Sequence, residues 1–376
     1  MSDSSFDDIT EMTDDTFSVL ADHGVQQVLH CTDARSGLRA IIAIHSTELG
    51  PALGGARFRP YATDRDALLD ACRLARGMTF KHALAGLDQG GGKAVILGDP
   101  TTERSKPLLR AFGRFVDGLA GQYVTAEDVG TTCADMDLIR QETRHVAGVS
   151  EALGGSGDPS PATALGVLWA MRAAARHLWA GDLSGRLVVI SGVGKVGSAL
   201  ARLLAAEGTL LTIADIDRRR ASELAAELGA SVVDPVDAHT LDCDIFAPCA
   251  LGGVLDAERI PQLRCAAVVG SANNQLASKE DAARLAARGV LYVPDFVANA
   301  GGVINIAEEI TGYDHTRADR RVAQIYDTVL AVLAEAERIG ATSDDAAEAI
   351  ALRRIEDHSK RPNPAQAGSA PNAPHD

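Results

Sequence analysis

The second half of the chain shows a regular succession of apolar and amphipathic segments. Short apolar runs predict buried strands, and stretches with apolar residues three or four positions apart predict helices. Strands are expected at 187–191, 210–214, 244–247, 266–270 and 290–293, and helices at 160–181, from the turn after 191 to about 207, at 218–228 and at 278–288. Ser160 is expected as the N-cap of the first helix, with Pro161 at its first position. This alternation predicts a doubly wound parallel sheet with helices on both faces.

The first half mixes strands and helices less regularly, which extends the α/β class to the whole chain. Strands are expected at 28–31, 38–44 and 94–97, and helices at 64–78, 106–119 and 134–142. Residues 33–37 have the composition of a hairpin loop between the first two strands. Thr63 and Asp66 form the pattern of a capping box at the start of the first helix.

Length and composition bound the organisation of the chain. A chain of 376 residues is longer than one hydrophobic core usually organises, so two domains are expected. Residues 1–15 are acidic and polar, and residues 359–376 are rich in Pro, Ala and Gly, so both are expected to be disordered tails. No apolar run reaches 18 residues and the first residues do not resemble a targeting signal, which predicts a cytoplasmic protein without a membrane span.

Charge and cysteine content exclude several classes of function. The formal net charge is −15, which repels nucleic-acid phosphates and anionic membrane surfaces, so neither is expected as a partner. The 6 cysteines form no C-x-x-C pair and lie beside no histidine at metal-ligand spacing. Reduced thiols are therefore expected, and no metal site.

A glycine-rich turn provides the strongest single motif. It follows the predicted strand 187–191 directly and opens a helix, as the dinucleotide fingerprint G-x-G-x-x-G requires. Asp215 ends the next strand, where a carboxylate binds the ribose hydroxyls of NAD and repels the 2′-phosphate of NADP. The basic run 218–220 could serve such a phosphate, but a solvated helix turn is the simpler interpretation. The predicted cofactor residues of this motif are Gly192, Val193, Gly194, Lys195, Val196, Gly197 and Asp215.

Three ionisable residues stand beside glycines or at a strand end. Lys81 follows an apolar segment, and Lys93 follows three glycines at the head of an apolar strand. Burial would lower the pKa of such a lysine and make it a usable base, whereas a charged lysine could bind a carboxylate. Asp128 lies at the end of a predicted strand, where α/β enzymes place proton-transfer groups. Taken alone, these residues are equally compatible with surface lysines and a helix N-cap.

A series of longer motifs resembles a known family. These motifs are LGG at 53–55, ARGMTFK at 75–81, AGLDQGGGK at 85–93, TAEDVGT at 125–131, GDPSP at 157–161, DIFAPCA at 244–250, GSANNQL at 270–276 and NAGGVIN at 299–305. Together they resemble the glutamate/leucine/phenylalanine/valine dehydrogenase family over residues 25–356, and most closely its leucine and valine members.

The resemblance implies a division of the chain. Residues 1–150 would form a substrate-binding and oligomerisation domain, and residues 151–329 an NAD-binding Rossmann domain. Helices at about 330–358 would return to the first domain. The substrate would bind in the cleft between the domains, and the protein would be a homo-oligomer of unspecified size.

The resemblance also implies roles for individual residues. Lys81 matches the lysine that binds the substrate carboxylate, Lys93 the lysine that helps water to attack, and Asp128 the carboxylate that exchanges protons with the substrate amine. The remaining implied contacts are Gly54, Gly55 and Asn274 with the substrate, and Thr163 and Asn273 with the cofactor, although the roles of the two asparagines could be exchanged.

Substrate choice follows from four apolar positions. The residues that match the family's side-chain pocket are Leu53, Ala126, Val303 and Ile306. An aliphatic pocket rejects a second carboxylate but separates valine from leucine only weakly. A branched-chain substrate is expected, with valine first because residues 45–53 look closest to valine dehydrogenases.

Three alternatives remain open at this stage. The first is a dehydrogenase of phenylalanine or another apolar amino acid. The second is an NAD-binding protein without catalysis, in which the two lysines and Asp128 would tolerate substitution. The third is a 2-hydroxy-acid dehydrogenase, which needs a histidine near an arginine, and no such pair stands out in the sequence.

Overall fold

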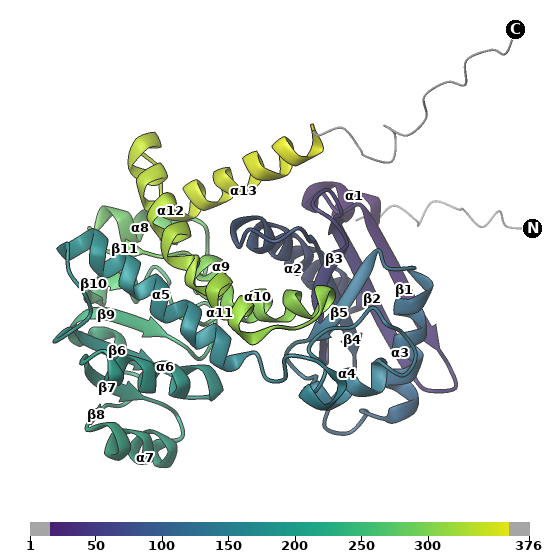
Figure 1. The fold of residues 1–376 in the computed structure, drawn as a ribbon, viewed down its shortest axis with the longest axis horizontal. Helices are drawn as coiled ribbons and strands as arrows, with labels where there is room; N and C mark the ends of the chain where they lie inside the picture. The colour runs from purple at the N-terminus through teal and green to yellow at the C-terminus, as the bar shows by residue number, and fades with distance from the viewer. Residues whose placement is uncertain (1–15, 361–376) are drawn as a thin grey trace, which may run out of the picture.

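The apolar runs of the first third of the chain form one of two β-sheets in the computed structural model, which describes residues 16–360 (Figure 1). The first lobe consists of α1 (Thr16–His23), β1 (Gln27–Asp33), β2 (Leu38–Ser46), β3 (Ala52–Arg59), α2 (Asp64–Leu84), β4 (Gly90–Leu97), α3 (Lys106–Gly118), β5 (Tyr123–Glu127) and α4 (Cys133–Ile139). Its strand order is β1-β2-β4-β3-β5. The predicted hairpin at 33–37 is confirmed, since β1 and β2 pair in antiparallel fashion on either side of it.

Strand β2 shows why this sheet is covered on both faces. Its even-numbered residues, such as Leu38 and Ile42, pack against α3 and α4, whereas Ile41 and Ala43 pack against α1 and α2. Successive side chains of a strand point to opposite faces, so a continuous apolar run needs a helical layer on each side. The predicted capping box is also confirmed, because Thr63 and Asp66 cap α2 reciprocally.

The second lobe contains a parallel sheet of six strands in the order β11-β10-β9-β6-β7-β8. Its elements are α5 (Ser160–Trp179), β6 (Leu187–Ser191), α6 (Lys195–Ala206), β7 (Leu210–Ala214), α7 (Arg218–Leu228), β8 (Ser231–Val232), β9 (Asp242–Pro248), β10 (Arg264–Val268), α8 (Glu280–Ala287) and β11 (Leu291–Tyr292). The strand order reverses beside β6, as in the doubly wound dinucleotide-binding fold. The predicted fold class is therefore confirmed.

The start of α5 differs by one residue from the sequence prediction. Pro159 occupies the N-cap position, and Ser160 is the first helical residue rather than the cap. The side chain of Asp158 accepts a hydrogen bond of 2.9 Å from the Ser160 backbone N–H. Asp158 thus satisfies one of the N–H groups that the first turn of a helix leaves without a partner.

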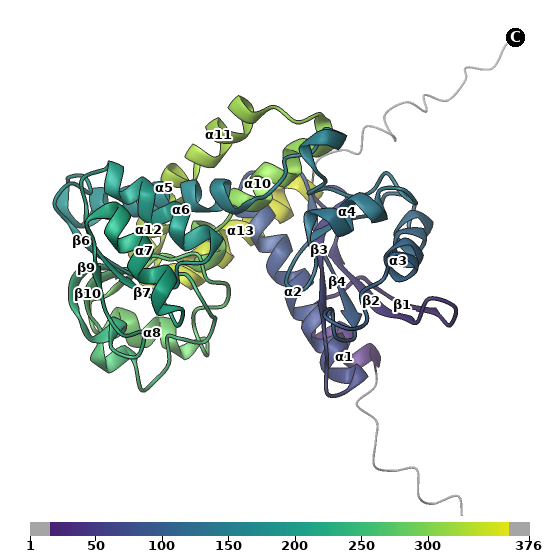
Figure 2. The same cartoon turned by 90° about the horizontal axis from the view of Figure 1, so that it is seen from below.

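The last of the C-terminal helices returns to the first lobe, whereas those before it pack mainly on α5 of the second lobe (Figures 1 and 2). After α9 (Asp295–Ala298), α10 (Gly301–Ala307), the short 3₁₀ helix η4 (Glu308–Thr311), α11 (His315–Ala323) and α12 (Ile325–Ile339), the last helix is α13 (Ser343–Ser359). Arg354 on α13 donates hydrogen bonds to the carbonyls of His82 and Ala83 at the end of α2, and pairs with Asp88 at 2.9 Å. The tails expected at 1–15 and beyond 360 lie outside the described residues.

The segment between α4 and α5 connects the two lobes and is held by one carboxylate. Glu309 accepts hydrogen bonds from the backbone N–H groups of Gly148 and Ser156, at 3.0 and 2.8 Å, and from the Ser156 hydroxyl. The segment that connects the two lobes is thus hydrogen-bonded to η4.

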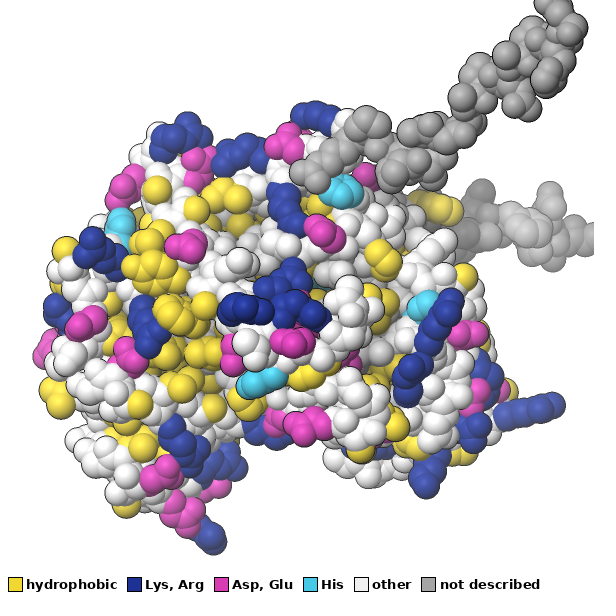
Figure 3. Space-filling view, in the orientation of Figure 1, with side chains coloured by type: hydrophobic (Ala, Val, Ile, Leu, Met, Phe, Trp, Pro, Cys, Tyr) yellow, Lys and Arg dark blue, Asp and Glu magenta, His cyan; other side chains and the backbone are white. Residues whose placement is uncertain are grey.

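Two further observations concern residues 16–360 only. No helix among them is long and apolar enough to cross a membrane, and they contain no group of three or more metal-ligating side chains. Acidic and basic side chains are interspersed on the face shown in Figure 3, which is notched between the two lobes at its lower edge.

Candidate active site

A cavity of about 320 Å³ lies between the lobes, a size typical of small-molecule sites. The first lobe contributes residues of α2, β3, β4 and β5, and the second contributes residues of α5, α6, α9, α10 and the segment after β10. The predicted substrate and cofactor residues that line it are Leu53, Gly54, Gly55, Lys81, Lys93, Ala126, Asp128, Thr163, Val196, Asn273, Asn274, Val303 and Ile306.

Glycines allow the strands of the first lobe to bring charged residues together. Gly55 on β3 is the register partner of Ala126 on β5. A Cβ atom at Gly55 would lie only 2.4 Å from the Glu127 carbonyl oxygen and 2.9 Å from Cβ of Asp128. Only glycine therefore permits the chain after β5 to pass so close to β3.

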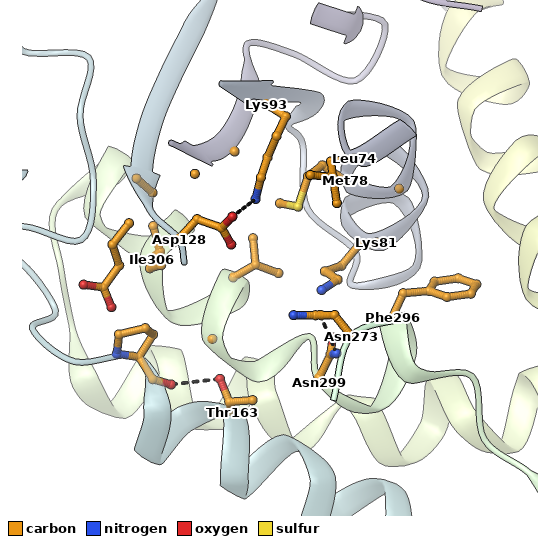
Figure 4. A pocket seen from close by; sticks show the side chains of 18 of the residues that line it. Leu74, Met78, Lys81, Lys93, Asp128, Thr163, Asn273, Phe296, Asn299 and Ile306 are labelled. Carbon is orange, nitrogen blue, oxygen red and sulfur yellow. Dashed lines mark hydrogen bonds and ion pairs between the residues drawn. The ribbon is translucent and has the colours of Figure 1, made fainter. Parts of the chain in front are cut away.

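Lys93 and Asp128 form a buried ion pair at the wall of the cavity (Figure 4). The Lys93 Nζ atom lies 3.2 Å from Oδ2 of Asp128, and their side chains are 7% and 15% exposed. Nε of Arg57 donates to the same oxygen at 2.8 Å. Arg57 also pairs with Asp70 on α2, at 3.1 Å.

Burial and neighbouring charges shift the pKa values of this pair. Burial lowers the pKa of Lys93, although Asp128 acts in the opposite direction. Burial would raise the pKa of Asp128, but Lys93 and Arg57 outweigh it and hold that pKa below its usual range. The pair therefore combines an ionised carboxylate with an amine that loses its proton more easily than an exposed lysine does.

Lys81 extends from α2 towards the centre of the cavity (Figure 4). Burial lowers its pKa to about 8, with Asp295 opposing the shift and Lys93 adding to it. The amine thus remains mostly protonated at neutral pH and can hold an anionic group. Asp295, which accepts a hydrogen bond from the Gln275 backbone N–H at 2.7 Å, has a pKa raised by burial.

The asparagines on the opposite wall are ordered by one hydrogen bond. Nδ2 of Asn299 donates to Oδ1 of Asn273 at 2.9 Å, which leaves the Asn273 amide nitrogen directed into the cavity (Figure 4). Asn274 lines the same wall with an unusual backbone φ of 53°.

The four predicted specificity residues all line the cavity. Leu53, Ala126, Val303 and Ile306 line it and are buried, apart from half-buried Val303. Three further apolar residues that the sequence did not indicate complete the lining, namely Leu74, Met78 and Phe296.

The glycine turn of the second lobe has the geometry that a dinucleotide requires. Gly192 has a φ of 105°, and a Cβ atom at Gly197 would lie 2.0 Å from the Gly192 carbonyl oxygen, so neither position tolerates a side chain. Nothing lies within 4 Å of a Cβ built at Gly194, which leaves that backbone open to a phosphate group. Oδ2 of Asp215 accepts a hydrogen bond of 2.7 Å from the Val193 N–H and thereby orders the turn.

Most of the fingerprint lies outside the cavity itself. Val196 lines the cavity, whereas Gly192, Val193, Gly194, Lys195, Gly197 and Asp215 do not. Lys195 instead forms a 2.9 Å ion pair with Asp158, in the connection between the lobes. The glycine turn and Asp215 thus lie outside the cavity, which only Val196 of this motif reaches.

The basic run after Asp215 is already neutralised by acidic partners. Arg218 pairs with Asp234, Arg219 with Glu223 and Arg220 with Asp217, and all three arginine side chains are exposed. The interpretation of this run as a solvated helix turn is therefore supported.

Sequence reasoning missed several polar residues of the cavity, among them Arg57, Asp295 and Asn299. Asn299 stands in the quoted motif 299–305 and could have been included from it. Arg57 would have required the recognition of β3, whose glycines weaken the strand pattern.

The fold and the site together define a class of protein. A doubly wound sheet with a dinucleotide turn faces a second lobe that presents a buried lysine–carboxylate pair across a cleft. This arrangement is that of a nicotinamide-nucleotide-dependent dehydrogenase.

Comparisons with known proteins identify the family. The model of the Glu/Leu/Phe/Val dehydrogenase dimerisation domain matches residues 25–145, and the Glutamate/Leucine/Phenylalanine/Valine dehydrogenase model matches residues 154–218 and 216–362. The leucine dehydrogenase of Geobacillus stearothermophilus is 49% identical over 93% of this chain and 95% of its own length. The valine dehydrogenase of Streptomyces albus is 51% identical over 88% of this chain and 92% of its own length.

A solved structure agrees with both the sequence and the fold. The L-tryptophan dehydrogenase from Nostoc punctiforme has a TM-score of 0.81 and 43% identity, covering 92% of this chain and 100% of the other. The chain belongs to the glutamate/leucine/phenylalanine/valine dehydrogenase family, which confirms the resemblance found in its motifs. It is an NAD-dependent amino-acid dehydrogenase.

Proposed function

We propose that this protein catalyses the reversible oxidative deamination of branched-chain L-amino acids (valine, leucine and isoleucine) to 2-oxo acids and ammonia, with NAD as the hydride acceptor. The observation that carries this proposal is the buried pair of Lys93 and Asp128 beside an apolar pocket, with the charged amine of Lys81 nearby. A second carboxylate on the substrate would find no cationic partner in that pocket.

Each group of the first lobe has a proposed role in binding. The Lys81 amine binds the substrate α-carboxylate, and the backbone at Gly54 and Gly55 lies against the same group. The aliphatic pocket then receives the side chain, which directs the α-hydrogen towards the second lobe. Asn274 is proposed to contact the substrate and Asn273 the nicotinamide, with Thr163 on the cofactor side.

The chemical step is divided between the two members of the pair. NAD, when bound, would supply the hydride acceptor, and loss of hydride from the substrate Cα would leave an iminium at that carbon. Lys93 removes a proton from the water that attacks this carbon, which forms a carbinolamine. Asp128 accepts a proton from the substrate ammonium before hydride transfer and later returns it to the amine nitrogen of the carbinolamine. The C–N bond then breaks and ammonia leaves, while the hydroxyl proton is lost as the 2-oxo acid forms. Closure of the cleft would exclude other water.

The second lobe is proposed to hold the cofactor between the turn 192–197 and the cavity. The open backbone of the turn 192–197 would receive the pyrophosphate, and Asp215 the adenosine ribose. The neutralised arginines after Asp215 support NAD over NADP, because none of them is free for a 2′-phosphate.

The proposed division of labour follows the two lobes. Residues 1–150, with the helices at about 330–358, would bind substrate and form the contacts of a homo-oligomer, and residues 151–329 would bind NAD. The family model that matches residues 25–145 is described as a dimerisation domain, which supports this assignment. Light scattering of the purified protein would test it.

The test of the proposed function is NADH formation with a panel of amino acids. Valine, leucine and isoleucine should give the highest kcat/KM, with valine first, and 2-oxo-acid reduction should require ammonia. Higher kcat/KM for glutamate or phenylalanine would contradict the substrate assignment. NAD binding without turnover of any amino acid would support a binding protein. Lys93→Gln should abolish turnover, whereas Lys106→Gln, at an exposed lysine of α3, should not.

A second substrate class is favoured by one observation. The solved tryptophan dehydrogenase has the same fold at 43% identity, so aromatic substrates are compatible with this architecture. Tryptophan and phenylalanine therefore belong in the panel. The aliphatic character of Leu53, Val303 and Ile306 makes them the weaker candidates here.

A further inference from the structure

Arg57 lies beside the pair of Lys93 and Asp128 and contacts its carboxylate. It projects from β3 into the wall of the cavity, and its side chain is 13% exposed. Nε donates to Oδ2 of Asp128 at 2.8 Å, on the same oxygen that Lys93 contacts at 3.2 Å. Among the described residues, both ion pairs of Asp128 involve its Oδ2 atom. The Oδ1 atom therefore remains available to a ligand.

The other end of the guanidinium is held in place by a second carboxylate. Nη1 of Arg57 pairs with Asp70 at 3.1 Å, and Asp70 itself accepts a hydrogen bond of 2.8 Å from the Tyr61 hydroxyl. Arg73 pairs with the other oxygen of Asp70 at 3.1 Å. Arg57 is therefore fixed between two acids, and its position does not depend on a bound substrate.

We propose that Arg57 is a positioning residue of the amino-acid dehydrogenase reaction, a permanent cation that orients Oδ1 of Asp128 towards the substrate amine and favours the neutral form of Lys93. This inference rests on the proposed function of the pair. Arg57 does not touch the reacting atoms itself, and it acts through the two groups that do.

The electrostatic effect of Arg57 has the same sign on both members of the pair. Its charge lowers the pKa of Asp128 by stabilising the carboxylate, and it lowers the pKa of Lys93 by repelling the ammonium. Lys93 and Asp128 stabilise each other's charged forms, which would keep Lys93 protonated. Arg57 opposes that tendency, so the amine can act as a base while the acid stays ionised.

Other titratable and charged groups surround Arg57, Lys93 and Asp128. The groups that face this cluster from the elements packed against it, with Lys93 and Asp128 themselves, are Asp70, Arg73 and Lys81 on α2, Lys93 on β4, Tyr123 and Glu127 on β5, Asp128, Asp295 on α9, and Tyr61 after β3. Among these groups only Lys93 pairs directly with Asp128, and Arg57 itself is the second cation that does so. Arginine keeps its charge at every working pH, and a lysine at position 57 would be held protonated by Asp70 and Asp128 on either side of it.

The test compares pH profiles of three variants. Arg57→Gln removes the charge, Arg57→Lys keeps it, and Arg59→Gln is the control, because Arg59 is an exposed arginine on the same strand. In Arg57→Gln the acidic limb of kcat/KM for valine oxidation should move up by about 1 pH unit, with about a tenfold loss of activity on that limb. Arg57→Lys should keep the limb of the parent enzyme at a reduced rate, and Arg59→Gln should match the parent.

Two outcomes would overturn the proposal. One is an unshifted limb in Arg57→Gln, and the other is an equal shift in Arg57→Lys, since then the charge would not be the cause. A purely structural role would lower the rate in both variants without moving the limb.

A second measurement separates this proposal from the proposed function. The pH dependence of Lys93 acetylation, followed by peptide mass spectrometry, reports the protonation of that amine without turnover. Its midpoint should rise by about 1 pH unit in Arg57→Gln even if no amino acid is oxidised. An unchanged midpoint would contradict the role of Arg57, whereas a raised midpoint in an enzyme inactive towards all amino acids would refute only the proposed function.

Discussion

Oδ1 of Asn299 is buried and has no hydrogen-bond partner among the residues that the structure describes. A buried polar atom without a partner is costly, so its presence here indicates that the rest of the Asn299 side chain has a role. Nδ2 of the same side chain orients Asn273. The Asn299 side chain therefore positions the Asn273 amide, which is proposed to face the nicotinamide.

We expect Asn299→Ala to raise the KM for NAD or amino acid by about fivefold, the equivalent of one lost hydrogen bond of ~1 kcal/mol. The temperature of unfolding should change little, because the variant also removes an unsatisfied acceptor. Steady-state kinetics and a thermal melt measure the two effects. Asn305→Ala is the matched control, since it loses a hydrogen bond from Tyr313 outside the cavity and should leave KM unchanged.

The pH dependence of stability should reveal Asp344, at the start of α13. Burial, with a contribution from Asp295, raises its pKa to about 6. Between the ordinary pKa of an aspartate and that value the folded state binds more protons than the unfolded state, so stability is lost as the pH rises through this window. Asp344→Asn should therefore stabilise the protein at pH 8 by roughly 1 kcal/mol and have little effect at pH 4. Urea denaturation at both pH values would measure this difference.

The control for this prediction is Asp327→Asn, at an exposed aspartate of α12, which should change the free energy of unfolding little at either pH. A stabilisation by Asp344→Asn that was equal at pH 4 and pH 8 would contradict the argument.

At the scale of elements, most strands and helices were predictable because their apolar patterns agree with their final burial. Strand 210–214 and helix 218–228 have the predicted bounds. Strand β3 was missed, since two glycines interrupt its apolar pattern. The reason for those glycines is tertiary, because they allow β5 and Asp128 to approach, and local sequence cannot reveal such a contact.

The contact between α13 and α2 should contribute measurably to the free energy of unfolding. Arg354→Ala removes hydrogen bonds to the carbonyls of His82 and Ala83 and the ion pair with Asp88. Hydrogen bonds from a charged group contribute about 1.5–3 kcal/mol, so the free energy of unfolding should fall by about 2 kcal/mol in urea denaturation. The neighbouring Arg353→Ala removes an ion pair of an exposed arginine with Glu335 and should cost less than about 1 kcal/mol. Equal losses in the two variants would mean that the carbonyl contacts contribute nothing.

At the scale of the whole molecule, the two-lobed architecture followed from alternation and length, and the family from its motifs. The convergence of the site was harder to foresee. Lys81, Lys93 and Asp128 come from α2, β4 and the end of β5, and only the order of the strands brings them to one cleft. Arg57 and Asp295 had no local signal at all, since their role depends on neighbours distant in sequence.

Motion between the lobes should depend on Glu309, which holds the connecting segment. Glu309→Gln cannot accept on both ends of its side chain, so one of the bonds to Gly148 and Ser156 must be lost. We expect hydrogen–deuterium exchange over residues 148–157 to increase by about tenfold, the equivalent of ~1.5 kcal/mol. Glu337→Gln, at an exposed glutamate of α12, should leave that exchange unchanged. Protection that persisted in Glu309→Gln would show that other contacts hold the connection.

The path of the chain also has a consequence for biosynthesis. One helix that covers α2 is α13, and its 17 residues are translated after both sheets. While they remain in the ribosomal exit tunnel, both sheets can already form, but the back of the helix that carries Lys81 stays uncovered. A chain truncated before Ser343 would leave α2 permanently without this cover, so the lobe that carries Lys81 is complete only after α13 has left the exit tunnel.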